Sequence, residues 1–356
     1  MTNDDRENHP ISILLQRWYS QNKRELPWRE TFDPYKIWIS EIILQQTRID
    51  QGMDYYLRFI VQYPDVLSLA AASETDVLKL WQGLGYYSRA RNLHAAAKQI
   101  EDRFMGKFPT SYDDILSLKG IGEYTAAAIA SIAYNQPYAV VDGNVYRVLS
   151  RLFSIATPIN STEGKKIFAA TAQSILDPRH AAAHNQALMD LGATVCTPKL
   201  TKCGVCPLQP VCLACERKEV EHFPVKTIKT TVKNRYFHYF HIINRGYIWI
   251  RERREKDIWK NLYEFPLIET DIPMDLAELQ KTKAFRNLFS QVTNPVFSAP
   301  YQTIHKLSHR NIFASIYRVT LSGKQDELPC PNLKISENRL PEYPISQLIH
   351  KYLKTI

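Results

Sequence analysis

The chain has 356 residues, of which 45% are hydrophobic and 23% charged, and its formal net charge is +9. This length exceeds that of one ordinary domain, so we expect two domains, and the basic excess favours a polyanionic partner. The first residues lack a signal-peptide pattern, and every apolar run is shorter than the roughly 20 residues that span a bilayer. The composition therefore predicts a soluble, cytoplasmic protein with no membrane partner.

One predicted helix places an acid on an apolar stripe. Asp33 is an expected N-cap for a helix over residues 34–47, in which Ile37, Glu41 and Leu44 share one face. Burial on that face would raise the pKa of the Glu41 carboxyl. A boundary residue turned to solvent fits the same pattern.

Helical periodicity dominates residues 1–215, where no stretch alternates convincingly as a strand. Residues 216–233 are charged and Thr-rich without periodicity, which predicts a linker. Beyond them, alternating runs flank Asn244-Arg245-Gly246, a hairpin signal, and residues 311–319 predict another strand. The further predicted helices cover residues 10–22, 52–62, 74–82, 88–100, 111–118, 122–135, 143–154, 163–176 and 181–193.

A glycine turn precedes an Ala-rich helix. Gly120 and Gly122 let the backbone approach a ligand closely, and the free N–H groups at the helix start suit a phosphate. Asp142 follows this helix in a Val-Asp-Gly-Asn run. An ordinary helix–turn–helix with a helix-capping Asp142 is the alternative interpretation.

Four cysteines lie within a short stretch that follows the pattern C-x6-C-x2-C-x5-C. Thiolates are soft ligands, so this cluster predicts zinc or an iron–sulfur cluster, and the spacing alone does not separate the two. Cys215 and Cys330 lie outside the pattern. The candidate ligands are Cys196, Cys203, Cys206 and Cys212.

Several motifs together resemble the helix–hairpin–helix DNA glycosylase superfamily and, within it, the adenine DNA glycosylases of the MutY type. The resemblance covers nearly the whole chain. It rests on Leu26-Pro27-Trp28-Arg29, Ser40-Glu41, Leu44-Gln45-Gln46-Thr47, Gly83-Leu84-Gly85-Tyr86-Tyr87-Ser88-Arg89, the Leu118–Ala126 hairpin and the cysteine loop.

This resemblance implies an all-α glycosylase domain over residues 1–215 with a 4Fe–4S loop, a linker over 216–233 and an α+β Nudix-like domain over 234–356. Within the first domain it implies a six-helix barrel module over about 27–136 and an iron–sulfur module from about 1–26 and 137–215. The four cysteines would hold one 4Fe–4S cluster with a structural, DNA-positioning role.

The resemblance also implies the chemistry. Glu41 would protonate the leaving adenine, and Asp142 would stabilise the oxocarbenium charge at C1′, with Tyr124 and Asn144 orienting the two acids. Glu41 is expected to be protonated in an apolar pocket and Asp142 ionised near the positive hairpin. Bifunctional relatives carry a lysine where this chain has Tyr124, which cannot form an imine, so the enzyme is expected to be monofunctional.

Binding roles carry over in the same way. Gly120 and Gly122 would contact phosphate, Arg29 and Gln186 the extruded adenine, and Thr47 the opposite base. Gln46, Leu84 and Tyr86 would fill the vacated stack, although Leu84 and Tyr86 also fit core positions. The target base would have to leave the duplex for catalysis.

Residues 259–266 resemble a Nudix-fold stretch, but the acidic run that holds magnesium in Nudix hydrolases is missing from residues 267–290. This domain is therefore expected to bind rather than hydrolyse. In the family it recognises 8-oxoguanine through a Phe-Ser-His loop, which here reads Leu307-Ser308-His309. Leu307 replaces the aromatic residue. A solvent-facing turn is the alternative for this loop.

The predicted function is removal of adenine opposite 8-oxoguanine or guanine in double-stranded DNA by a monomeric, monofunctional glycosylase, nucleoid-associated if the chain is bacterial. The alternatives are another glycosylase of the superfamily, acting on thymine mismatches or oxidised pyrimidines, and a non-catalytic iron–sulfur DNA-binding protein.

Overall fold

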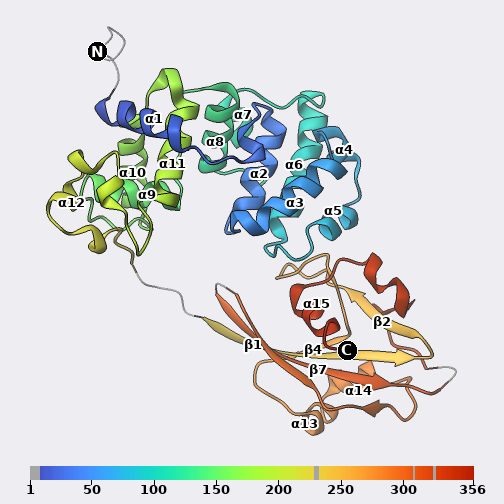
Figure 1. Cartoon of the computed structure of the whole chain (residues 1–356). Coiled ribbons are helices and arrows are strands. Elements are labelled where there is room, and N and C mark those ends of the chain that lie inside the picture. The colour runs from blue at the N-terminus through green and yellow to red at the C-terminus, as the bar shows by residue number, and fades with distance from the viewer. Residues whose placement is uncertain (1–8, 228–231, 308, 324–325) are drawn as a thin grey trace. The chain divides into compact units, whose positions relative to one another are not determined.

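The structure is a computed structural model that describes residues 9–227, 232–307, 309–323 and 326–356. The chain forms two compact units (Figure 1). The helical unit comprises Met1–Ala71 and Asn92–Ile228, and the sheet unit comprises Ala72–Arg91 and Lys229–Ile356. Ser308, which the resemblance assigns to lesion recognition, lies outside the described residues.

The first half of the chain is helical, as predicted, and residues 9–227 contain no β-strand. α5 (Glu74–Leu80) and the start of α6 (Ser88–Phe104) belong to the sheet unit. The α-helices of the helical unit are α1 (Pro10–Asn22), α2 (Pro34–Leu44), α3 (Ile49–Gln62), α4 (Val66–Ala71), the rest of α6, α7 (Tyr112–Leu116), α8 (Glu123–Tyr134), α9 (Gly143–Leu152), α10 (Thr162–Ile175), α11 (Ala181–Thr194) and α12 (Leu213–Glu216).

α8 is a central helix of this unit because small side chains let its neighbours approach closely. Its residues from Thr125 to Ile132 are all buried, and it contacts α2, α7 and α11. The predicted glycine turn precedes it, with Gly120 at φ +79° and Gly122 as the N-cap. A Cβ at Gly120 would also collide with the Asn92 side chain, so this position requires glycine.

Part of the predicted linker is packed against the helical unit. Arg151 donates hydrogen bonds from Nε to the carbonyl oxygens of Val220 (3.0 Å) and Phe223 (3.2 Å). Val220 is the first residue of a 3-10 turn, η6 (Val220–His222), which Phe223 follows, and β1 begins only at Lys233. Residues 216–227 therefore belong to the helical unit, where the sequence predicted a linker without regular structure.

The sheet unit contains one mixed sheet, in which the long strands β1 and β7 run parallel and β2, β4, β5, β6 and β8 pair antiparallel with their neighbours. The predicted hairpin joins β1 to β2 through Arg245 and Gly246, both at positive φ. The strands are β1 (Lys233–Asn244), β2 (Tyr247–Glu252), β3 (Tyr263–Glu264), β4 (Leu267–Thr270), β5 (Val296–Phe297), β6 (Tyr301–Lys306), β7 (Arg310–Thr320) and β8 (Leu333–Ser336).

Alternation along β1 sends side chains to opposite faces of this sheet. Phe240 packs with Phe285 and Phe289 of the α13 (Leu276–Gln280) and α14 (Lys283–Leu288) region. On the other face, His241 Nδ1 lies 3.0 Å from the Tyr352 hydroxyl of α15 (Gln347–Leu353). Figure 1 shows α15 on one side of the sheet and α13 and α14 on the other.

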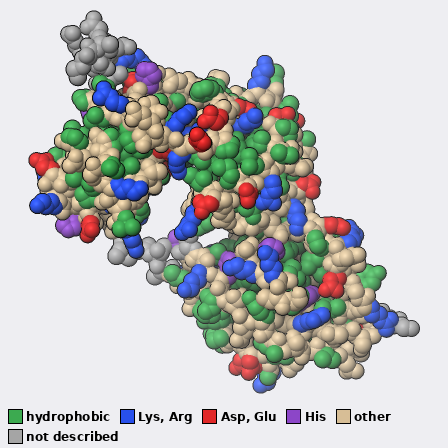
Figure 2. Space-filling view, in the orientation of Figure 1, with side chains coloured by type: hydrophobic (Ala, Val, Ile, Leu, Met, Phe, Trp, Pro, Cys, Tyr) green, Lys and Arg blue, Asp and Glu red, His purple; other side chains and the backbone are tan. Residues whose placement is uncertain are grey.

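The surface carries mixed charge. In the face shown in Figure 2, basic and acidic side chains are interspersed over both units. Among the described helices, none combines the length and the apolarity that crossing a membrane requires.

Candidate active site

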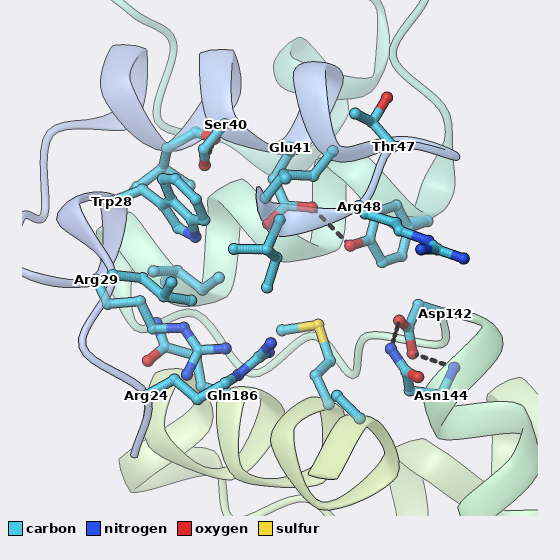
Figure 3. Close-up of a pocket in the computed structure, with 18 of the residues that line it drawn as sticks. Arg24, Trp28, Arg29, Ser40, Glu41, Thr47, Arg48, Asp142, Asn144 and Gln186 are labelled. Atoms are coloured by element: carbon cyan, nitrogen blue, oxygen red, sulfur yellow. Dashed lines mark hydrogen bonds between the residues drawn. The ribbon is translucent and has the colours of Figure 1, made fainter. Parts of the chain in front are cut away.

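A cavity of about 790 Å³ opens in the helical unit. Glu41, on α2, and Asp142, the residue directly before α9, both line this cavity (Figure 3). Two carboxylates that are far apart in the sequence thus line the same cavity. The predicted residues that also line it are Arg29, Thr47, Tyr124, Asn144 and Gln186.

Glu41 lies on the predicted apolar stripe, since Ile37 and Leu44 line the cavity beside it. The Tyr124 hydroxyl donates a 2.6 Å hydrogen bond to Glu41 Oε2. Burial raises the pKa of the Glu41 carboxyl, the Tyr124 hydrogen bond opposes this shift, and the nearby Asp142 charge adds to it. The site therefore favours the protonated form of Glu41, as a proton donor requires.

Asp142 is both the N-cap of α9 and a wall of the cavity. Its Oδ1 accepts hydrogen bonds from the backbone N–H groups of Asn144 (2.9 Å) and Val145 (2.7 Å), and Asn144 Nδ2 donates to Oδ2 (2.7 Å). Burial raises the pKa of Asp142, and these donors oppose the shift. The positive partial charge that stabilises the Asp142 carboxylate therefore comes from the N-terminus of α9. The sequence analysis expected it to come from the glycine hairpin.

Arg147 connects this acid to the cysteine loop, a role that sequence reasoning missed. Its Nη2 donates to Asn144 Oδ1 (2.8 Å) and to the Gly192 carbonyl (2.6 Å), and its Nε donates to the Cys196 carbonyl (2.7 Å). Arg147 lies one helical turn beyond Asn144 and faces the same side, which is the signal that could have found it.

A second polar group lies at the Arg29 end of the cavity (Figure 3). Arg29 donates from Nη1 and Nη2 to the Asp190 carboxylate (2.5 and 2.7 Å) and from Nη1 to the Tyr19 hydroxyl (3.0 Å), which donates to Gln186 Oε1 (2.6 Å). Sequence reasoning missed Tyr19 and Asp190. The sequence did contain a signal for this pair, because Asp190 lies among apolar residues of α11. A fully buried aspartate requires a charged partner, which here is Arg29.

The other predicted contact residues are distributed over both units. Gln46 is exposed at φ +56° in the helical unit. In the sheet unit, Leu84 is buried, Tyr86 is 49% exposed and His309 is exposed. Leu307, which is half-buried, directly follows β6, and its N–H donates a 2.8 Å hydrogen bond to the Arg310 carbonyl.

The four candidate cysteine ligands line one small cavity in the helical unit, together with Cys215 and Arg151. Arg151 Nη1 donates a 3.3 Å hydrogen bond to Cys196 Sγ. Among the described residues, no three ligand side chains are close enough to hold a single metal ion. The cavity thus gathers sulfur donors beside a cation but has no single-ion geometry.

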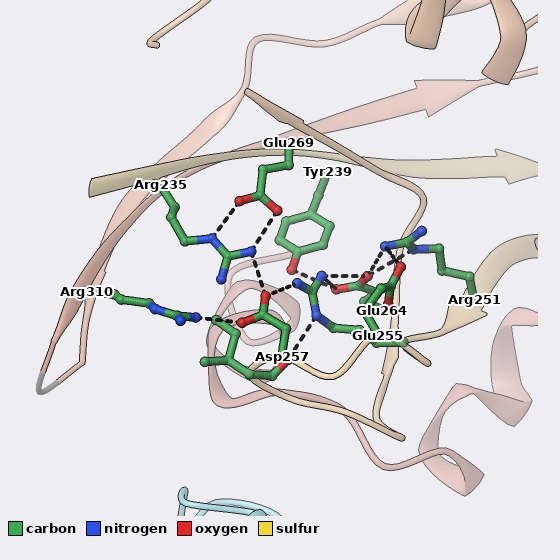
Figure 4. Close-up of polar contacts among 10 residues, drawn as sticks. Arg235, Tyr239, Arg251, Glu255, Asp257, Glu264, Glu269 and Arg310 are labelled. Atoms are coloured by element: carbon green, nitrogen blue, oxygen red, sulfur yellow. Dashed lines mark hydrogen bonds and ion pairs between the residues drawn. The ribbon is translucent and has the colours of Figure 1, made fainter. Parts of the chain in front are cut away.

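The sheet unit holds a different kind of acidic site (Figure 4). The Asp257 carboxylate pairs with Arg235 (2.6 Å), Arg253 (2.8 Å) and Arg310 (2.5 Å). Buried Glu264 pairs with Arg251 (2.7 Å) and also with Arg253 (3.2 Å). Arg310 begins β7 directly after the Leu307–His309 turn, so this network anchors the base of the predicted lesion-contacting loop.

Comparisons with known proteins match both parts of the chain. The profile of the HhH-GPD superfamily of base excision DNA repair proteins matches residues 39–174, and that of the NUDIX domain matches residues 238–355. An adenine DNA glycosylase of Buchnera aphidicola subsp. Baizongia pistaciae is 39% identical over 352 residues, covering 96% of each chain. The chain belongs to the adenine DNA glycosylase family.

The family includes an enzyme of Buchnera aphidicola subsp. Acyrthosiphon pisum, 33% identical over 343 residues and covering 92% of this chain and 97% of its own. The human adenine DNA glycosylase is 42% identical over 216 residues, 58% of this chain and 40% of its own. A solved thermostable thymine-DNA glycosylase is 28% identical with a TM-score of 0.54, covering 58% of this chain and 95% of its own. The protein is thus a base excision repair hydrolase of N-glycosyl bonds.

Proposed function

We propose that this glycosylase removes adenine opposite 8-oxoguanine or guanine in double-stranded DNA, with Glu41 as general acid and Asp142 as stabiliser of the cationic sugar. The observation that carries the proposal is that these two carboxylates line one cavity with unequal hydrogen bonding. Glu41 receives one hydrogen bond from Tyr124, and Asp142 receives three, from the Asn144 and Val145 backbone and from the Asn144 side chain.

Glu41, Asp142 and one water molecule account for the proton transfers and the bond changes of this reaction. Glu41 gives its proton to N7 of adenine, and the C1′–N9 bond breaks with its electron pair moving to the base. Asp142 then stabilises the oxocarbenium charge at C1′ until a water oxygen adds there, and the proton of that water restores the Glu41 acid. Positioned proton transfer contributes on the order of 10²–10⁴-fold to such a step. Since Tyr124 cannot form an imine, cleavage ends at the abasic site.

DNA engagement is assigned to the remaining predicted residues. Arg29 and Gln186 would hold the extruded adenine, because their polar groups line the cavity. Gln46, Leu84 and Tyr86 would replace it in the stack, Thr47 would face the opposite base, and the N–H groups after Gly120 and Gly122 would bind phosphate. The loop Leu307–His309 would read the oxidised base.

The cysteine loop is proposed to hold one 4Fe–4S cluster through Cys196, Cys203, Cys206 and Cys212. Each thiolate of such a cluster binds a different iron, so the sulfur atoms lie farther apart than around one zinc ion. The cavity gathers the four candidate thiolates, with Cys215 and the Arg151 guanidinium beside them, and this soft donor set suits such a cluster. The bonds of Arg147 and Arg151 to the loop would offset the negative charge of the thiolates and keep the loop beside Asp142.

We expect the enzyme to act as a monomer in the cytoplasm, close to DNA.

Single-turnover release of adenine tests the substrate assignment. Matched duplexes would carry A opposite 8-oxoguanine, A opposite G and A opposite T, with a duplex carrying T opposite G as the control for a thymine-specific glycosylase. Release from the first two and retention in the others is the expected result. No release from A opposite 8-oxoguanine, or equal release from A opposite T, contradicts the proposal, and release of thymine would favour the thymine-mismatch alternative.

The colour and the iron content of the purified protein test the proposed 4Fe–4S cluster. Anaerobically purified protein should be yellow-brown, contain about four irons per chain for one 4Fe–4S cluster, and lose its visible absorbance on Cys203→Ser. A colourless protein with stoichiometric zinc would contradict the cluster.

A further inference from the structure

The segment Ala72–Arg91 leaves the helical unit and packs with Lys229–Ile356 as part of the sheet unit. Arg91 Nη1 donates to the Lys260 carbonyl (2.8 Å), and Lys79 Nζ donates to the Tyr343 carbonyl (3.4 Å). Asn261 also donates its side-chain amide to the Glu74 carboxylate. The segment that carries Leu84 and Tyr86 is therefore bound along its length by the C-terminal part of the sheet unit.

The loop at the centre of this segment has an unusual backbone. Gly83, Gly85 and Tyr86 all have left-handed φ angles, of +105°, +74° and +47°. Tyr86 is not a glycine, so its conformation costs free energy and must be held by its surroundings. Trp81 Nε1 donates to the Gly85 carbonyl (3.1 Å), which fixes one side of the loop.

The other side is held by a buried tyrosine. The Tyr87 hydroxyl accepts a hydrogen bond from the Gly83 N–H (3.4 Å) and donates to the Ile345 carbonyl (3.1 Å). Gln82 Oε1 accepts from the Ile345 N–H (3.2 Å), so both backbone polar groups of Ile345 are bonded to this segment. Tyr87 and Ile345 are only 3% and 5% exposed, which makes an unpaired group there costly.

Ile345 is itself part of the sheet unit's framework. It forms a parallel bridge with Tyr263 of β3, and the Tyr263 N–H donates to the Pro344 carbonyl (2.8 Å). The neighbouring residue, Glu264, belongs to the arginine network of Figure 4. The loop backbone is thus fastened to the same framework that anchors the base of the Leu307–His309 turn.

We propose that Tyr87, assisted by Gln82, is a positioning residue that holds the Gly83–Tyr86 loop in the shape that inserts into the DNA stack, using the C-terminal part of the sheet unit as its support. This inference rests on the proposed function, because it takes Leu84 and Tyr86 as the residues that fill the vacated stack. Its consequence is that removing one buried hydroxyl impairs base extrusion rather than duplex binding or bond cleavage.

The test uses Tyr87→Phe, which keeps the buried ring, and Gln82→Met, which keeps the side-chain length. Tyr247→Phe is the matched control, since Tyr247 is a half-exposed tyrosine of the same unit. In a Glu41→Gln background, a duplex with 2-aminopurine at the target position opposite 8-oxoguanine reports extrusion by its fluorescence. Tyr87→Phe should lower the extruded fraction about fivefold, the equilibrium weight of one hydrogen bond, with duplex affinity unchanged.

Single-turnover excision then separates the possible outcomes. With Glu41 present, the rate deficit of Tyr87→Phe should be about fivefold for adenine opposite 8-oxoguanine and should shrink when adenine lies opposite an abasic site, where extrusion costs less. An equal deficit on both duplexes, or the same behaviour for Tyr87→Phe and Tyr247→Phe, would overturn the inference. Failure of the otherwise unmodified enzyme to release adenine would contradict the proposed function instead.

Discussion

Two acids, one from each unit, have pKa values shifted in opposite directions by their partners. Glu41 in the helical unit is bonded by one neutral hydroxyl, and its pKa is raised. Asp257 in the sheet unit is bonded by three arginines, and although burial opposes it, these hydrogen bonds bring its pKa well below the usual range. Figures 3 and 4 show the contrast between an open cavity wall and a closed network.

The number and charge of its partners decide whether a carboxyl group can exchange a proton near neutral pH. A carboxyl group with few partners keeps a proton that it can give away, and it reduces stability in its ionised form. A carboxylate with three cationic partners cannot exchange a proton near neutral pH, but it ties together segments that are distant in the sequence. A carboxyl group thus has its pKa raised at Glu41 and lowered at Asp257 because its partners differ.

Glu41→Gln should have the largest effect on the rate of adenine release. Adenine release should fall on the order of 10²–10⁴-fold, because the amide has no proton to donate. Stability near neutral pH should rise on the order of 1 kcal/mol, because folding no longer has to raise the pKa of an acid at this position. Single-turnover excision and thermal unfolding measure the two quantities on one preparation.

The control for this variant is Glu123→Gln, which changes an exposed glutamate at the start of α8. It should leave both measurements unchanged. Turnover of Glu41→Gln at the unsubstituted rate would remove Glu41 from the acid role.

Asp142→Asn should have the next largest effect. Asparagine keeps the N-cap of α9, so unfolding should change little, while adenine release should fall at least about 100-fold because the cationic sugar loses its counter-charge. Activity and thermal unfolding should therefore separate. A loss of both together would mean that Asp142 acts only as a cap.

Asp257→Asn should reverse this pattern. Removing the charge leaves three arginines short of a partner, so the sheet unit should lose about 3 kcal/mol of unfolding free energy. Denaturant unfolding measures this loss, with Glu342→Gln as the control, since the exposed Arg339–Glu342 pair should contribute nothing measurable. If both variants unfold alike, the network has no architectural role.

The smallest effects are in the pH profiles. Because the pKa of Glu41 is raised, excision should decline as pH rises through that value, and Glu41→Gln should lack this decline. Because the pKa of Asp257 is lowered, its contribution is complete above the ordinary aspartate value of 3.8 and is lost as pH falls below it. Unfolding of Asp257→Asn and the parent protein should therefore converge only in acid.

Much of this molecule could be predicted from local sequence. The N-cap at Asp33, the helix over α2, the glycine turn before α8 and the Arg245-Gly246 hairpin all follow from short-range geometry. The apolar stripe around Glu41 is equally local, because residues three and four apart share a helix face. These features depend on backbone conformations that neighbouring residues determine.

Pairings between distant segments could be decided only by the tertiary structure. Asp190 meets Arg29 across 161 residues, and Tyr87 meets Ile345 across 258. Periodicity shows that a side chain faces inward, but it does not show which segment lies opposite. The sequence by itself determined most helices of residues 10–193, the β1–β2 hairpin, strand β7 and the acid on an apolar face. Packing decided that Asp142 shares its cavity and that Ala72–Arg91 joins the sheet unit.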